Sequence, residues 1–128
     1  MSQYLTATGI AVSDLDISTQ FYTESIGMTV NRTLALDHLV QNILIFEGVR
    51  GAAIILIQYN EERNCKDLPV KLVFNSPNVR GIIEAVRKAG GVVHKEAVEY
   101  DNMGGSTIGF VKDPDGYLLE LIQKPAKK

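Results

Sequence analysis

The chain has 128 residues, a length typical of one domain that can bury a sizeable core. A hydrophobic share of 45%, a charged share of 22% and a net charge of −2 are ordinary for a globular protein and do not indicate nucleic acid or an anionic membrane as a partner. No apolar run approaches the roughly 18 residues that span a bilayer, and no signal peptide is recognisable, so we expect a cytoplasmic protein. The single cysteine, Cys65, excludes an internal disulfide framework and a cysteine-based zinc site.

Strands are predicted in segments rich in aliphatic, β-branched and aromatic residues that are bounded by Gly, Pro, Asn and Asp. These segments are residues 4–12, 28–34, 39–47, 52–59, 70–75, 92–96, 106–112 and 117–123.

Two segments predict helices instead. The first follows Asp16, a suitable N-cap, and ends at Gly27. The second follows Asn78, keeps an apolar i, i+3, i+4, i+7 pattern and ends at Gly90. The apolar positions of the second helix are Val79, Ile82, Ile83 and Val86.

The order of these elements is duplicated. It is β-α-β-β-β, then β-α-β-β-β again, in modules of about residues 1–62 and 68–124. Each half would leave one face of its sheet exposed, and two halves, in one chain or in two, can curl those faces around a common cleft. We therefore expect a single α+β domain over residues 1–128.

The stretch "DPDGYLLELIQ" at 113–123 combines a turn with an unusual carboxylate. Asp113, Pro114 and Gly116 fit the first, second and last positions of a type I turn that launches the last strand. Glu120 lies among leucines within that strand. A bare carboxylate there costs several kcal/mol unless it is paired, protonated or solvated.

Four stretches together resemble the glyoxalase/bleomycin-resistance/dioxygenase family, also called the vicinal oxygen chelate superfamily. They are "GIAVSDLDISTQFYTESIGM" at 9–28, "AIILIQYN" at 53–60, "AVRKAGGVV" at 85–93 and "GFVKDPDGYLLELIQ" at 109–123. The resemblance implies two βαβββ modules with eight strands and two main helices. It also implies a homodimer, because two-module chains of this kind usually dimerise.

The resemblance further implies a divalent metal held by four side chains, two from each half, which are His, Glu, His and Glu in metal-dependent lactoylglutathione lyases. The corresponding positions here are Ala7, Leu56, Lys71 and Glu120. Only Glu120 keeps a carboxylate, and an ammonium at Lys71 would repel a cation. We therefore expect no metal cofactor and no metal-dependent glyoxalase I activity.

Period-2 alternation assigns further residues to the faces of these four positions. The expected ligand-binding residues on the strands are Ala7, Gly9, Ile54, Leu56, Gln58, Val73, Asn75 and Leu118. Tyr100 and Met103, in a loop that often borders the cleft in this family, are expected to contact the ligand as well. Largely apolar walls with a few polar groups are typical of a site for a small, apolar organic molecule.

Lys71 and Glu120 admit more than one interpretation. As catalytic residues, Glu120 would be a general base or acid and Lys71 its tuner, or a clamp for a developing enolate, in a metal-independent isomerase or lyase. As structural residues, they would form a salt bridge that replaces the metal. The alternatives at the level of the protein are non-catalytic binding of a small molecule or antibiotic, as in bleomycin-resistance-like sequestration, and a degenerate member with a closed cleft.

Overall fold

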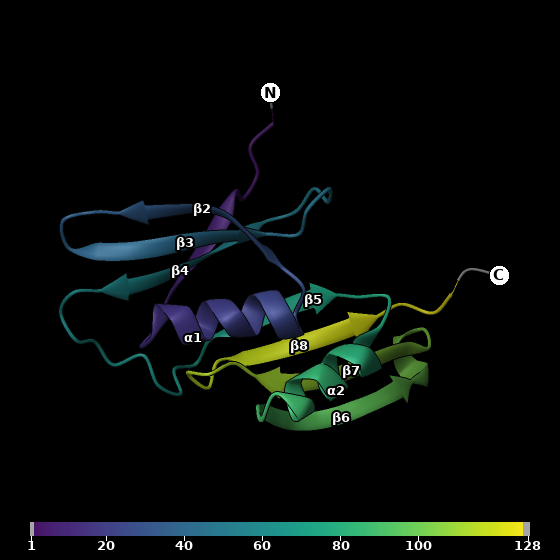
Figure 1. The fold of residues 1–128 in the computed structure, drawn as a ribbon. Helices are drawn as coiled ribbons and strands as arrows, with labels where there is room; N and C mark the ends of the chain where they lie inside the picture. Colours follow the sequence, from purple (N-terminus) through teal and green to yellow (C-terminus); the bar gives the residue numbers. More distant parts are fainter. Residues whose placement is uncertain (1, 127–128) are drawn as a thin grey trace. The chain divides into compact units, whose positions relative to one another are not determined.

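The computed structural model describes residues 2–126, and the chain divides between Lys66 and Asp67 into two compact units. Over the described residues there are eight strands and two main helices, which confirms the expected α+β fold and the repeated β-α-β-β-β order (Figure 1). None of the helices in residues 2–126 has the length and apolar character needed to cross a bilayer.

The N-terminal unit contains a four-stranded sheet in the order β1-β4-β3-β2. Its elements are β1 (Ala7–Ala11), α1 (Leu15–Gln20), a π-helical turn (Phe21–Ser25), β2 (Thr29–Ala35), β3 (Leu39–Ile45) and β4 (Ala53–Tyr59). β1 runs parallel to β4, whereas β2, β3 and β4 are joined antiparallel. Helix α1 packs on β3 and β4 and therefore covers one face of this sheet.

Helix α1 begins two residues earlier than the sequence indicated. The carboxylate of Asp14, not that of Asp16, accepts the backbone N–H of Ile17 at 3.1 Å. Asp14 has the extended backbone of an N-cap, and Asp16 lies inside the first turn. The predicted end is confirmed at Gly27, whose φ of 92° favours glycine.

The C-terminal unit contains a second sheet in the order β5-β8-β7-β6. Its elements are β5 (Lys71–Asn75), α2 (Val79–Lys88), β6 (Val92–Tyr100), a 3₁₀ turn (Asp101–Met103), β7 (Ser106–Lys112) and β8 (Leu118–Gln123). β5 is parallel to β8, and the remaining pairs are antiparallel. β6 is longer than the predicted 92–96, because register shifts near Lys95 interrupt the alternation that marks a strand.

Helix α2 is fixed to its sheet by capping and by close packing. The side chain of Asn78 accepts the N–H of Gly81 at 3.0 Å, as the sequence predicted for an N-cap. Ile83 and Val86 are buried in the same core as Leu119 and Leu121. A Cβ at Gly109 would overlap the side chain of Ile83, so glycine is needed where the helix meets β7.

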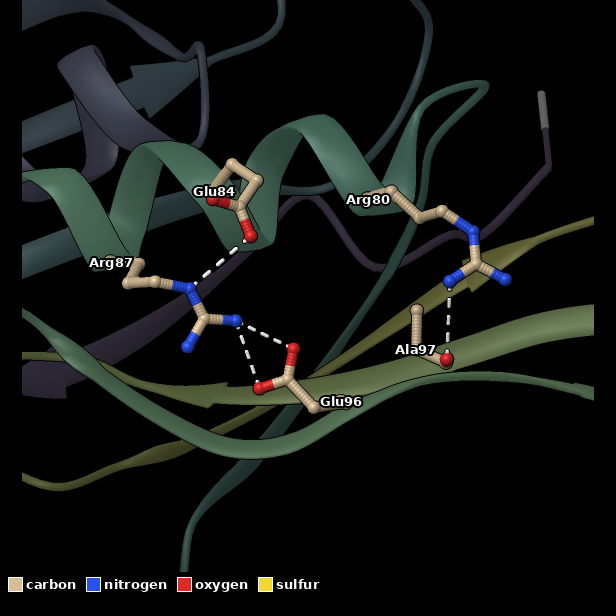
Figure 2. A network of polar contacts seen from close by, with 5 residues as sticks. All are labelled: Arg80, Glu84, Arg87, Glu96 and Ala97. Carbon is tan, nitrogen blue, oxygen red and sulfur yellow. Dashed lines mark hydrogen bonds and ion pairs between the residues drawn. The ribbon is translucent and has the colours of Figure 1, made fainter.

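Polar contacts reinforce the outer side of α2 (Figure 2). The Arg87 guanidinium donates to Glu96 of β6 at 2.6 and 2.9 Å and to Glu84 at 3.2 Å. Arg80 donates to the carbonyl oxygen of Ala97 at 3.2 Å. These contacts hold α2 on one face of the C-terminal sheet, and α2 does not cover the opposite face.

Candidate functional site

The turn before β8 has the geometry that "DPDG" predicted. The N–H of Gly116 donates to the carbonyl of Asp113 at 2.9 Å, and Gly116 has a φ of 89°. The Asp113 carboxylate accepts the N–H groups of Asp115 and Tyr117 at 3.0 and 2.9 Å. This network fixes where β8 starts and therefore which side of the sheet Glu120 faces.

Glu120 is paired with Lys71. The Lys71 ammonium donates to the Glu120 carboxylate at 3.0 Å, and the two side chains are 52% and 14% exposed, respectively. The two residues come from adjacent parallel strands, in which Val73 is the direct partner of Glu120. Lys71 thus neutralises the Glu120 carboxylate, as expected in the interpretation of the two residues as a salt bridge.

The face that carries this pair lies opposite α2. Phe74, Leu119 and Leu121 are buried, whereas Val73 and Asn75 are exposed and Leu118 is half-buried. Because side chains alternate along a strand, Lys71, Val73, Asn75, Leu118 and Glu120 share the open face. The structure therefore places the expected residues of β5 and β8 on one face, and their role in ligand binding stays a prediction.

The N-terminal unit differs from the expectation at β4. Leu56 is fully buried and is paired with Asn42, whose amide donates to Thr19 of α1 at 2.9 Å. Leu56, and with it Ile54 and Gln58, therefore lies on the face covered by α1. Gln58 accepts the N–H of Leu15 at 2.7 Å, at the start of that helix.

Ala7 and Gly9 lie on the other face of the same sheet. A Cβ at Gly9 would be 3.1 Å from Ile57, so Ile57 rather than Leu56 shares the face of Gly9. The expectation that these strand residues share one face was wrong: Ala7 and Gly9 lie on the open face, and Ile54, Leu56 and Gln58 lie on the face covered by α1. The reason is that "AIILIQYN" is apolar at successive positions, so its sequence does not distinguish the two sides of the strand.

Tyr100 and Met103 lie at one end of the β6–β7 connection. Tyr100 is the last residue of β6 and pairs with Ser106, whereas Met103 is in the 3₁₀ turn and 50% exposed. Neither contacts the Lys71–Glu120 pair through any hydrogen bond or ion pair found in the described residues. Their role as ligand contacts stays a prediction.

The open face of the C-terminal sheet also presents residues that the sequence did not assign to the site. Lys112 of β7 is directly opposite Leu118. The ring of His94 meets Phe110 edge-on, with centroids 6.4 Å apart. Because side chains alternate along paired strands, the β7–β8 hairpin predicts that Lys112 and Phe110 share the face of Glu120. The same rule does not predict the side of His94, which lies next to a register shift in β6.

The four positions compared with metal ligands do not suit an ion in this chain. Ala7 and Leu56 have no donor atoms, and Leu56 faces the core. The Lys71 ammonium occupies one side of the Glu120 carboxylate. No group of three or more His, Cys, Asp or Glu side chains in residues 2–126 is arranged to hold a metal.

Comparison with known proteins identifies the family of the chain. The family model of the glyoxalase/bleomycin resistance protein/dioxygenase superfamily matches residues 4–121. The lactoylglutathione lyase of Haemophilus influenzae is 34% identical over 94% of this chain and 93% of its own length. That of Salmonella typhimurium is 35% identical over 91% and 89%.

Solved structures of glyoxalase I resemble the fold closely. The enzyme of Leishmania major has a TM-score of 0.77 and 25% identity, with 96% of this chain and 88% of that chain covered. A maize glyoxalase I mutant has a TM-score of 0.80 and 26% identity, with 95% and 45% covered. The chain also spans only 42% and 41% of the Brassica oleracea and Arabidopsis thaliana relatives.

These relatives correct two expectations drawn from the sequence. We expected neither a metal cofactor nor glyoxalase I activity, but the matched relatives, at 32–37% identity, are named lactoylglutathione lyase or probable lactoylglutathione lyase. The resemblance described above links that class to a divalent metal, so the substituted ligand positions do not justify treating the protein as cofactor-free. The family model covers nearly the whole chain and the fold agrees with it, so this protein belongs to the glyoxalase/bleomycin resistance protein/dioxygenase superfamily.

Proposed function

We propose that the protein binds a small, largely apolar organic molecule on the open face of its C-terminal sheet and acts on it as a lyase, with Glu120 as the proton-transferring group. The observation that supports this most directly is the Glu120 carboxylate, which is 14% exposed, lies between Leu119 and Leu121 and is hydrogen-bonded to Lys71 at 3.0 Å. The names of the relatives support lyase chemistry.

The chemistry follows from the two charges. A carboxylate within hydrogen-bond reach of a carbon acid next to a carbonyl can remove its proton. Negative charge then develops on the carbonyl oxygen, and an ammonium beside the carboxylate can stabilise it. Lys71 is suited to this because it is half exposed and can move between Glu120 and a ligand. Val73 and Leu118 would contact the apolar part, and Asn75 would supply a further polar contact.

Substitution of Glu120 tests this function. Glu120→Gln keeps the shape but removes the basic oxygen, so lactoylglutathione lyase activity, or turnover of another small carbonyl compound found by screening, should fall at least about a hundredfold. Glu99→Gln removes an exposed carboxylate from the same unit and should leave turnover unchanged. Activity in Glu120→Gln equal to that of the parent would refute the assignment, provided that both proteins melt at similar temperatures.

Binding without chemistry is the second candidate. The hydrocarbon side chains of Val73 and Leu118 on the open face favour it, because they contribute no group that could take part in a reaction. In that case, native mass spectrometry of the purified protein would detect a retained small molecule that is released unchanged. Conversion of that molecule on incubation would exclude simple sequestration.

A further inference from the structure

The C-terminal unit has a hollow of about 280 Å³ at the end of its sheet where β8 begins. Leu118 forms part of its floor, and the loop before β5 forms one wall. That wall is fixed, because the N–H of Asp67 donates to the carbonyl of Asp115 at 2.8 Å and the N–H of Leu118 donates to that of Val70 at 3.1 Å. The hollow therefore has a defined shape.

Basic side chains surround the floor of this hollow. Leu118 is paired with Lys71 on one side and with Lys112 on the other, so the two lysines flank it at the same level of the sheet. With neighbouring strands about 4.8 Å apart, their Cα atoms are separated by roughly 10 Å, a gap that two long side chains can close around a small group. His94 of β6 also lines the hollow.

The pairing of the charges identifies which groups are available. Lys71 is engaged by Glu120. Neither Lys112 nor His94 has a side-chain hydrogen bond or ion pair within residues 2–126. Among the described residues that line the hollow, Asp67 is the one acidic residue, and its carboxylate lies against Gly116. The free positive charge thus comes from Lys112, and His94 adds a ring nitrogen beside it.

We propose that this hollow binds an oxyanion, the carboxylate or phosphate group of the small molecule on which Lys71 and Glu120 act. Apolar walls beside two unpaired nitrogen donors fit a molecule with a hydrocarbon body and one acidic end. Only the statement that the bound group belongs to the substrate rests on the proposed function; the hollow and its donors do not depend on catalysis.

The test is a titration of the 128-residue chain with inorganic phosphate and, separately, with acetate, at constant ionic strength. Amide resonances of Lys112 and Leu118 should shift saturably with at least one probe, and the tighter probe identifies the acidic group. Lys112→Gln should weaken binding about tenfold or more, because a charge-assisted hydrogen bond is lost. Lys112→Arg should retain most of it. Asp67→Asn, which tolerates the φ of 53° at this position, should strengthen it.

Lys88→Gln is the matched control, because it removes an equal charge from the exposed last turn of α2. No saturable shift with either probe, or equal weakening by Lys88→Gln and Lys112→Gln, would overturn the inference. Glu120→Gln separates the two proposals. Anion binding with unchanged turnover in Glu120→Gln refutes the proposed catalytic role alone. Loss of turnover in Glu120→Gln without any anion binding by the parent refutes the anion site alone.

Discussion

At the scale of single residues, Lys71 and Glu120 form an ion pair whose members differ in access to water. The lysine side chain is 52% exposed and the glutamate side chain 14%. Removal of Lys71 leaves the less solvated carboxylate without a partner, whereas removal of Glu120 leaves an ammonium that water can solvate. Lys71→Met should therefore lower the free energy of unfolding by about 1–2 kcal/mol, and Glu120→Gln by less than about 1 kcal/mol. Urea denaturation measures both, and the reverse order would contradict this account.

Individual site residues were predictable where a motif fixed the register. "DPDG" anchors the start of β8 and therefore the direction of Glu120, whereas the proximity of Glu120 to Lys71 was implied by the family resemblance, which assigns both residues to metal-ligand positions. Leu56 had no comparable anchor. Ile54, Ile55, Leu56 and Ile57 are all aliphatic, and the decisive signal was a polar one in the neighbouring strand, where Asn42 bonds to α1. Sequence alone did not reveal which face of β3 that asparagine occupied.

At the scale of elements, mutations can distinguish the observed N-cap of α1, Asp14, from the predicted N-cap, Asp16. Asp14 accepts the N–H of Ile17, and Asp16 is an exposed residue of the first turn. Asp14→Ala should cost about 1 kcal/mol, because it leaves a helix N–H without an acceptor. Asp16→Asn removes only a favourable charge near the helix dipole and should cost a few tenths of a kcal/mol. Equal effects in thermal denaturation would argue for a different helix start.

The contacts between α2 and β6 predict a pH dependence of stability. The hydrogen bond from Arg87 lowers the pKa of Glu96, and those to Glu96 and Glu84 raise the pKa of Arg87 (Figure 2). A carboxyl group with a lowered folded-state pKa stabilises the fold above its unfolded pKa and loses that contribution as the pH falls through the folded value. Arg87→Gln should therefore lower the melting temperature slightly at about pH 7 but not at about pH 2.

Salt provides a control for the same variant. The side chains of Arg87, Glu84 and Glu96 are largely exposed. High salt should therefore screen their ion pairs and reduce the difference in melting temperature between Arg87→Gln and the parent. Arg80→Gln removes a guanidinium that donates to a backbone carbonyl rather than to a carboxylate. Its effect should be less sensitive to pH, and equal pH dependence in both variants would refute the role of Glu96.

The elements themselves were largely predictable because their boundaries carry strong local signals. Asn78 caps α2, Gly27 ends the first helical segment, and the aliphatic runs of β3, β4 and β8 coincide with strands. β6 was underestimated because its bulges place polar residues such as Lys95 and Glu96 out of alternation. Caps and turns are set by residues three or four positions apart and can be recognised in the sequence, whereas the position of a bulge depends on the partner strand.

At the scale of the whole molecule, each unit buries only one face of its sheet beneath its own helix. The open face of the N-terminal sheet carries half-buried isoleucines on adjacent strands, among them Ile43, Ile55 and Ile57. An apolar sheet face is stabilised when another surface covers it. We propose that a second copy of this chain contacts this face, so that the protein is a homodimer, as the family resemblance implies.

Sedimentation velocity at micromolar concentration tests this assembly. The parent protein should sediment as a dimer of the 14.1-kDa chain. Ile55→Lys places a charge on the open face and should shift the protein towards monomer, because burying an unpaired ammonium in an interface costs several kcal/mol. Ile17→Lys adds the same charge on α1, where the side chain is already 55% exposed, and should leave the dimer intact. A monomeric parent, or equal dissociation by both variants, would exclude a dimer built on this face.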